Sequence, residues 1–269
     1  MYLGWIICIL AVLYIFALRG RRGHKNLPEI RKWRYAHRGL HGNGIPENSM
    51  AAFREALDGG YGVELDVHLL KDGNLAVIHD SLLIRTTGAE GRIEDLTTEE
   101  LTQYHLEGTN QTIPSFQEVL DLFAGKAPLV VELKAERGNH AALTEKACQM
   151  MDTYPGAYCI ESFDPRCVLW LKKNRPDVMR GQLTENFFSK QSKGKIHWVL
   201  KFIMTQQLGN FLTLPDFVAY RFADRRNLGN LIVRKIWRVH GVTWTVRSPE
   251  DHDVAEKEGW TTIFEGFRP

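Results

Sequence analysis

Short apolar runs alternate with amphipathic helical stretches along most of this chain, and this alternation limits the folds that it can adopt. After residue 33 the pattern offers nine short strand segments for a fold of roughly eight strands, and most of them are followed by a helix. The expected strand segments are 34–36, 63–69, 75–78, 129–133, 158–161, 181–183, 217–220, 242–246 and 261–264, and the clearest helices are expected at 47–57, from 115, at 140–152, and from 165, 225 and 249.

Helical crossovers join parallel strands, so repeated strand–helix units indicate a parallel sheet. Their number, in a chain of 269 residues, favours a closed (β/α)₈ TIM barrel over an open doubly wound sheet. No Gly-x-Gly-x-x-Gly follows the first strand, which argues against a dinucleotide-binding domain. The stretch 185–215 is ambiguous, since a helix, a loop or an insertion fits it equally well.

The composition is that of a globular protein, with 44% hydrophobic and 25% charged residues. The four cysteines form no CxxC pair, so neither a zinc ribbon nor a disulfide scaffold is expected. The net charge of +2 is unevenly distributed: seven of the 34 basic and one of the 32 acidic residues precede residue 35, which leaves −4 for the rest. A mildly acidic domain is a poor partner for nucleic acid, and no protein partner is predicted.

Residues 2–18 are uncharged and almost wholly apolar. As a helix they would extend about 26 Å, at the lower limit of a membrane span. Neither a basic n-region nor a small-residue cleavage site is present, so a retained single-pass anchor is expected in preference to a cleaved signal peptide. We therefore divide the chain into a transmembrane helix (1–18), a basic juxtamembrane linker (19–33) and a catalytic barrel (34–269), with the barrel in the cytoplasm by the positive-inside rule.

Charged and polar side chains gather where the expected strands end, which is where TIM barrels carry their chemistry. Glu64 and Asp66 are two residues apart and so point to the same face of one strand. The other candidates are His37 and Arg38 after the first strand, His79 after the third, and Glu132 and Lys134 on the fourth. In apolar strands, unpaired charges would cost several kcal/mol on burial, so a shared function explains them better than separate structural roles do.

Glu64, Asp66 and Glu132 are hard oxygen ligands without a thiolate or imidazole among them. Such a set suits one divalent cation, Mg²⁺ or Ca²⁺, and not zinc. A cation flanked by Arg38 and Lys134 makes a site for an anion, and phosphate is the best candidate. His37 and His79 beside a phosphate would serve general acid–base cleavage of a phosphoester.

Several motifs in one order resemble the glycerophosphodiester phosphodiesterase family: His37-Arg38-Gly39, Pro46-Glu47-Asn48-Ser49, Glu64-Leu65-Asp66-Val67, Lys71-Asp72-Gly73, His79-Asp80, Arg85-Thr86-Thr87-Gly88, Glu132-Leu133-Lys134 and Trp244-Thr245-Val246. The resemblance spans about 35–269 and is most specific over 35–90. It implies a metal-dependent phosphoric diester hydrolase that converts glycerophosphodiesters to glycerol phosphate and an alcohol.

The same resemblance implies a role for each matching residue. His37 and His79 correspond to the acid–base pair, Glu64, Asp66 and Glu132 to the metal ligands, and Arg38 and Lys134 to the phosphate-binding residues. Trp244 corresponds to an aromatic residue of the substrate pocket. The implied mechanism begins with attack on phosphorus by the neighbouring hydroxyl of the substrate's glycerol, and water then opens the cyclic phosphate.

Two departures from the family pattern affect the substrate, not the reaction. Arg247 stands where many members have Asn, and the chain ends in residues 264–269 (FEGFRP) in place of a Thr-Asp-x-Pro-like tail. Residues 190–214 are basic and rich in aromatic residues, which fits either a barrel helix or a stretch lying on a membrane. The alternatives are therefore a lysophospholipase D-like enzyme acting at the membrane surface and, less favoured, a barrel that binds without catalysis.

Overall fold

The computed structural model describes residues 2–190 and 197–269. Its strands are β1 (Tyr35–His37), β2 (Gly62–Leu69), β3 (Leu75–Val77), β4 (Leu129–Leu133), β5 (Tyr158–Ser162), β6 (Arg180–Thr184), β7 (Phe217–Arg221), β8 (His240–Val246) and β9 (Thr261–Phe264). Its α-helices are α1 (Tyr2–Ala17), α2 (Leu27–Ile30), α3 (Met50–Asp58), α4 (Ile84–Thr87), α5 (Phe116–Phe123), α6 (His140–Met151), α7 (Pro165–Asn174), α8 (Trp198–Thr205), α9 (Asn210–Thr213), α10 (Leu228–Lys235) and α11 (Pro249–Lys257).

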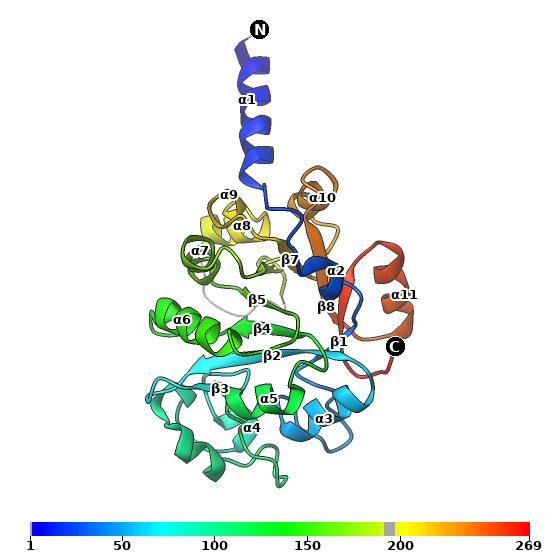
Figure 1. Ribbon diagram of the computed structural model, residues 1–269. Helices are drawn as coiled ribbons and strands as arrows, with labels where there is room; N and C mark the ends of the chain where they lie inside the picture. Colours follow the sequence, from blue (N-terminus) through cyan, green and yellow to red (C-terminus); the bar gives the residue numbers. More distant parts are fainter. Residues whose placement is uncertain (1, 191–196) are drawn as a thin grey trace.

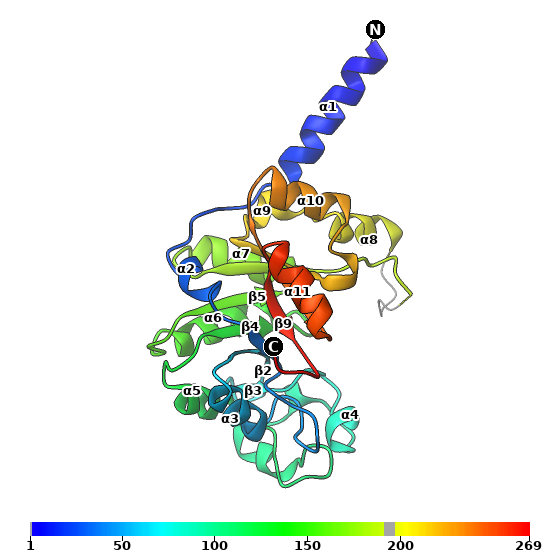
Figure 2. The same cartoon turned by 90° about the vertical axis from the view of Figure 1, so that its right-hand side faces the viewer.

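Eight parallel strands of the described chain close into a barrel (Figure 1), as the alternation predicts. Each of these strands pairs with the next in the order β1, β2, β4, β5, β6, β7, β8, β9. β1 pairs in parallel with both β2 and β9, and this double pairing closes the sheet. The helices lie around the outside (Figures 1 and 2). The TIM-barrel prediction is confirmed.

β3 is not a barrel strand. It pairs antiparallel with β2, with Val67 opposite Val77 and Leu69 opposite Leu75. The two strands are joined by the short turn at 71–74, which is long enough for a hairpin but too short for the crossover that a parallel pairing needs. The hairpin extends β2 beyond the barrel and brings the residues after β3 back toward the barrel mouth.

Two apolar layers hold the barrel together. Buried side chains from seven barrel strands, among them Tyr35, Val130, Leu183, Phe217 and Ile263, form one cluster, and strands on opposite sides can meet in this way only along the barrel axis. A larger cluster packs the outward-facing strand residues against the surrounding helices. Both layers are expected for a small barrel whose interior is filled by side chains.

Local sequence signals account for several helix starts. Ser115 accepts a hydrogen bond from the Glu118 backbone N–H while the Glu118 side chain accepts one from the Ser115 N–H, and this capping box begins the helix predicted from 115. Pro165 and Pro249 each stand in the first turn of a helix, after the N-cap residues Asp164 and Ser248.

The apolar N-terminal run forms α1, which projects from the domain beside α9 and α10 (Figures 1 and 2). α1 has 16 residues, and among the described residues we find no helix whose length and apolarity would let it cross a membrane. The predicted transmembrane helix is therefore not confirmed. Part of the run belongs to the domain instead: Leu18 is fully buried against Val218 and Val233, and Tyr14 donates a hydrogen bond to Gln206.

The segment 19–33, which was expected to be a linker, packs against the barrel. Arg21 makes a two-point ion pair with the buried Asp216, and α2 packs Ile30 into the barrel's inner cluster. The ambiguous stretch contains two short helices, α8 and α9, and its residues 191–196 lie outside the described part. α8 buries only Thr205, so it is not the core-facing barrel helix that one interpretation of 190–214 expects.

Candidate active site

Three carboxylates meet at the carboxyl ends of neighbouring strands. Glu64 and Asp66 lie on β2, and Asp66 is in register with Glu132 on β4. One oxygen from each side chain lies within 4.8 Å of the other two. Glu64, Asp66 and Glu132 are 2%, 1% and 7% exposed, so solvent does little to screen their mutual repulsion. The pair on β2 therefore faces the acid on β4, as the alternation of side chains along a strand predicts.

Burial, followed by the nearby Asp66 and Glu132, raises the pKa of Glu64 well above its ordinary value. For Asp66, burial acts in the same direction, but Lys134, His79 and Arg38 together bring its pKa well below the ordinary value. Positive charge that enters this buried cluster lowers the repulsion between its carboxylates and favours their ionised forms. Three hard oxygen donors at this spacing fit a divalent cation such as Mg²⁺ or Ca²⁺.

The two predicted phosphate-binding cations flank this cluster. Lys134 Nζ lies 2.6 Å from Glu132 Oε1 and 3.0 Å from Asp66 Oδ1. Although burial opposes it, Asp66 and Glu132 raise the pKa of Lys134, so the ammonium stays charged. Arg38 places its Nε 3.4 Å from Asp66 Oδ2 and bonds Glu47 through its guanidinium. An anion bound here would contact the positively charged side chains of Arg38 and Lys134, which these ion pairs hold in position.

Both predicted histidines point one ring nitrogen at a carboxylate. His37 Nδ1 lies 2.6 Å from Glu265 Oε2, and His79 Nδ1 lies 2.6 Å from Asp80 Oδ1. An ionised carboxylate only accepts hydrogen bonds, so each histidine donates from Nδ1 and leaves Nε2 available. Burial lowers the pKa of His37 to about 4 despite the opposing effect of Glu265. The ring is therefore neutral at pH 7 and can accept a proton.

The catalytic pocket has a volume of about 340 Å³ and is lined by His79, Glu132, Lys134, Phe163 and Asp164, among others. Trp244, near the carboxyl end of β8, contacts the pocket lining from behind: its ring meets Phe163 edge to face at 5.6 Å, and its Nε1 donates to the Ala219 carbonyl. The structure thus brings all eight predicted site residues to one barrel mouth.

Sequence reasoning missed the residues that hold these groups in place. Asn48 donates to Asp66 at 2.9 Å, Glu47 bonds both Arg38 and Arg85, and Arg85 also bonds Asp80. Glu47, Asn48 and Arg85 stand inside motifs that carry the resemblance, which is a usable signal. No such sequence signal indicated Glu265, because its partner His37 is 228 positions away in the chain.

A fourth buried acid, Glu161 on β5, is in register with Glu132. Burial and Glu132 raise its pKa well above the ordinary value. Among the described residues, Glu161 is not part of the group in which Glu64, Asp66 and Glu132 bring their oxygens within 4.8 Å of one another. From the sequence, the only sign of Glu161 is that it is an acidic residue on an expected barrel strand.

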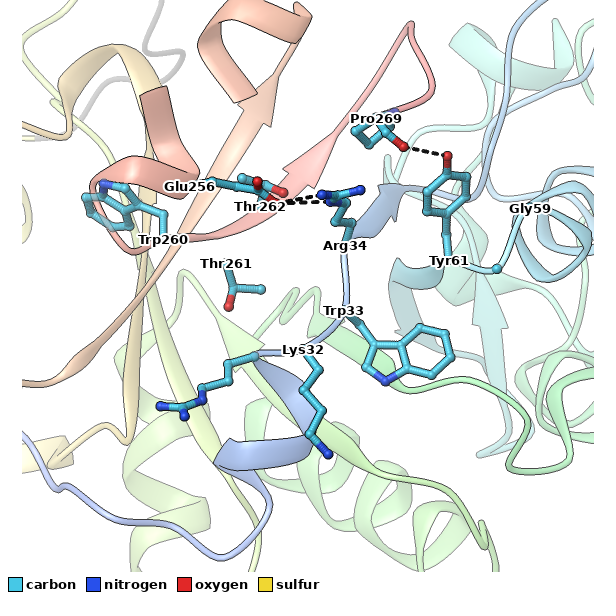
Figure 3. A pocket seen from close by; sticks show the side chains of 12 residues that line it. Lys32, Trp33, Arg34, Gly59, Tyr61, Glu256, Trp260, Thr261, Thr262 and Pro269 are labelled. Atoms are coloured by element: carbon cyan, nitrogen blue, oxygen red, sulfur yellow. Dashed lines mark hydrogen bonds and ion pairs between the residues drawn. The ribbon is translucent and has the colours of Figure 1, made fainter. Parts of the chain in front are cut away.

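The opposite end of the barrel has a polar groove of about 370 Å³. Figure 3 shows its side chains: Arg34 pairs with Glu256, and Tyr61 donates to the Pro269 carbonyl. Arg34, Tyr61 and Glu256 precede β1, β2 and β9, so the groove lies at the amino ends of the strands. In TIM barrels that face contributes to stability, whereas reactions occur at the other.

The rim of the catalytic pocket contains an acid whose pKa predicts a pH effect on stability. His68 Nδ1 lies 2.8 Å from Glu94, and Ser81 donates to Glu94 at 2.6 Å. Burial raises the pKa of Glu94, but these hydrogen bonds outweigh it and lower the pKa to about 2. In the unfolded chain the value is about 4.3, so the carboxylate stabilises the fold above that pH, and this contribution is lost as the pH falls toward 2.

We expect Glu94→Gln to lower the urea midpoint at pH 7 and to make stability fall less steeply between about pH 4.3 and 2. Urea unfolding at several pH values measures both effects. The exposed Glu99 of the following loop gives the matched control Glu99→Gln. Equal slopes in the two variants would contradict this account of Glu94.

Comparison with known proteins identifies the fold and the family. A family model described as the glycerophosphoryl diester phosphodiesterase family matches residues 37–265. A glycerophosphodiester phosphodiesterase of Bacillus subtilis is 30% identical over 259 residues, covering 86% of this chain and 82% of the relative. One from Bacillus altitudinis is 41% identical over 129 residues, covering 45% of this chain and 52% of the relative, so the match spans about half of that protein.

A solved structure shares the fold at low sequence identity. It is an Oleispira antarctica phosphodiesterase in complex with the product sn-glycerol-3-phosphate, with a TM-score of 0.71 and 20% identity, covering 88% of this chain and 93% of that one. At that identity the likeness shows the barrel alone. The family model and the Bacillus subtilis relative match most of the chain in sequence as well. They show that this chain belongs to the glycerophosphoryl diester phosphodiesterase family.

Proposed function

We propose that the chain hydrolyses glycerophosphodiesters to glycerol phosphate and an alcohol, using one divalent cation, Mg²⁺ or Ca²⁺. Glu64, Asp66 and Glu132 would hold the cation, and residues 34–269 would form the catalytic unit. The observation that carries the proposal is the buried carboxylate triad, with ligand oxygens within 4.8 Å of one another, beside two histidines and two cations. The names of the Bacillus relatives and of the product-bound structure support the same substrate class.

The bound cation would supply positive charge to the phosphate and to the attacking hydroxyl. Arg38 and Lys134 would bind the phosphoryl oxygens, whose charge increases in the transition state. The nucleophile is the neighbouring hydroxyl of the substrate's own glycerol, and water opens the cyclic phosphate in the second step. Overall, one water molecule is consumed, and one P–O bond is broken for each alcohol released.

His37 suits the base, because its neutral ring has Nε2 free while Glu265 accepts from Nδ1. His79 suits the acid that protonates the leaving alcohol, since Asp80 would stabilise its protonated ring. In the second step the neutral His79 would take a proton from the attacking water, and the protonated His37 would return its proton to the glycerol hydroxyl, so each histidine would regain its own starting state. Trp244 and Phe163 would contact the apolar edge of the substrate.

The experiment is an assay of glycerophosphocholine hydrolysis, with glycerol phosphate measured by a coupled enzyme. We expect activity to vanish after exhaustive chelation and to return with Mg²⁺ or Ca²⁺. The 2-deoxy analogue lacks the attacking hydroxyl and should react at least about 100-fold more slowly. Full activity in the chelated protein would contradict the metal site, and equal turnover of the analogue would contradict the cyclic intermediate.

A further inference from the structure

A second group of metal-ligating side chains lies at the same barrel mouth, outside the carboxylate triad. One ligand atom from each of His37, His41 and Glu265 lies within 4.8 Å of the other two. His37 ends β1, His41 lies in the loop that follows, and Glu265 comes directly after β9, which pairs with β1. All three side chains are partly exposed, so an ion can reach them from solvent.

His41 has an unsatisfied ring nitrogen. Its Nε2 is buried and has no hydrogen-bond partner among the described residues. A buried polar atom of this kind costs stability until a hydrogen bond or a ligand satisfies it. Imidazole nitrogens are common metal ligands, so an ion bound between His41, His37 and Glu265 would use a side chain that the proposed reaction does not need.

The donor atoms of this group differ in kind from those of the triad. Mg²⁺ and Ca²⁺ prefer oxygen ligands, whereas two imidazoles and one carboxylate suit a transition metal such as Zn²⁺. His37 Nδ1 and Glu265 Oε2 are 2.6 Å apart. Ligand atoms around one zinc ion lie about 3.4 Å apart, so adjustments of about 1 Å would admit the ion. Arg247 also bonds Glu265, but its side chain is 64% exposed and can turn away.

The His37 ring separates this group from the triad. Its Nδ1 faces Glu265, and its Nε2 lies 3.9 Å from Glu64 Oε2. The two ring nitrogens point outward in different directions. An ion bound to Nδ1 therefore does not occupy the place of a cation held by Glu64.

We propose that His37, His41 and Glu265 form an inhibitory site for a transition-metal ion, Zn²⁺ being the best match, separate from the site for Mg²⁺ or Ca²⁺. The inhibition rests on the proposed function, whereas the metal binding does not. A neutral imidazole carries one N–H, so an ion bound to Nδ1 leaves that proton on Nε2. Nε2 then cannot accept a proton from the attacking hydroxyl, and the first step loses its base.

The first test measures metal binding without turnover, in protein kept in excess Mg²⁺ so that the triad is filled. We expect Zn²⁺ to bind with one-to-one stoichiometry, measured by competition with a chromogenic chelator, and Co²⁺ to show the visible absorption of a nitrogen-ligated ion. His41→Asn should weaken Zn²⁺ binding by at least about 10–100-fold, the loss that removing even a supporting residue of a metal site causes.

His140→Asn is the matched control. His140 is also partly exposed and has a buried ring nitrogen without a partner among the described residues, but it does not belong to the group around His37. This variant should bind Zn²⁺ as the wild type does. Equal affinities in the wild type and His41→Asn would overturn the inference, and so would a wild-type protein that binds neither Zn²⁺ nor Co²⁺ in excess Mg²⁺.

The second test follows glycerophosphocholine turnover at fixed Mg²⁺ while Zn²⁺ is added. We expect the wild type and His140→Asn to lose at least about tenfold in kcat, since general acid–base catalysis contributes about 10²–10⁴-fold. His41→Asn should keep the basal kcat and resist Zn²⁺. Additional Mg²⁺ should not relieve the inhibition. If it does, Zn²⁺ competes for the triad and the inference is wrong.

These outcomes separate the inference from the function on which it rests. A protein that hydrolyses glycerophosphocholine but binds Zn²⁺ only in competition with Mg²⁺ keeps the proposed function and loses the second metal site. A protein that binds Zn²⁺ through His41 but cleaves no glycerophosphodiester keeps the metal site and loses the function. Thermal melting shows whether each variant is folded, and the Co²⁺ spectrum of the wild type tests the site without any substitution.

Discussion

Replacing His37 with asparagine is expected to lower kcat by about 10²–10⁴-fold, the range that general acid–base catalysis supplies. Asparagine can still donate a hydrogen bond to Glu265 but cannot take up a proton from the substrate. Since His37 is buried and neutral at pH 7, the substitution adds no charge to the site. KM should change little, because Arg38 and Lys134 would still bind the phosphate. Steady-state kinetics with glycerophosphocholine measures both constants.

The control for this variant is His105→Asn, at an exposed position that does not line the catalytic pocket. It should retain wild-type turnover. A His37→Asn protein with wild-type kcat would show that another group takes the proton, and His79 would be the first candidate to examine. A variant with unchanged kcat but a large rise in KM would place His37 in binding instead.

The expectation that polar groups gather at the strand ends predicted the central carboxylates of the site, because their relative positions follow from the backbone geometry of the strands. Glu64 and Asp66 share a face wherever that segment is extended, and parallel pairing then places Asp66 beside Glu132. Neither step needs side-chain packing. The residue pattern therefore contained enough information to bring together Asp66 and Glu132, which are 66 positions apart.

The supporting contacts could not be predicted in this way. Glu265 reaches His37 because β9 closes the barrel against β1, and closure of the barrel is a property of the whole chain. The tail departs from the family pattern in sequence, yet it still places the carboxylate of Glu265 beside His37. The role of a residue at a late strand end thus depends on which early strand lies next to it.

The fold could be predicted from the sequence, but which apolar residues of the N-terminal run and of α8 are buried could not. Hydropathy counts Leu18 as part of the N-terminal run, whereas the structure buries it in the domain. α8 shows the reverse problem, because its sequence resembles a core-facing helix while most of its apolar residues remain exposed. Hydropathy measures how apolar a segment is and not what covers it.

Replacing Glu64 with glutamine is expected to change the stability of the metal-free and metal-loaded protein in opposite directions. Without metal, Glu64 is buried beside Asp66 and Glu132, and that environment raises its pKa well above the ordinary value. A carboxyl group of this kind destabilises the fold as the pH rises above about 4.3, and glutamine, which cannot ionise, removes the penalty. The chelated variant should therefore be more stable than the chelated wild type at pH 7, by about 1–3 kcal/mol.

With Mg²⁺ or Ca²⁺ the order should reverse. Metal at 1,000 times its Kd stabilises a protein that binds it by about 4.1 kcal/mol, which exceeds the gain expected in the chelated variant, and the variant should lose most of this shift together with activity. Glu161→Gln is the matched control, because Glu161 is also a buried strand glutamate with a raised pKa. It should share the gain in the chelated state but keep the metal-induced shift. Thermal melts of the three proteins, with and without metal, measure all of these effects. A Glu64→Gln protein that metal still stabilises as much as the wild type would remove Glu64 from the cation site.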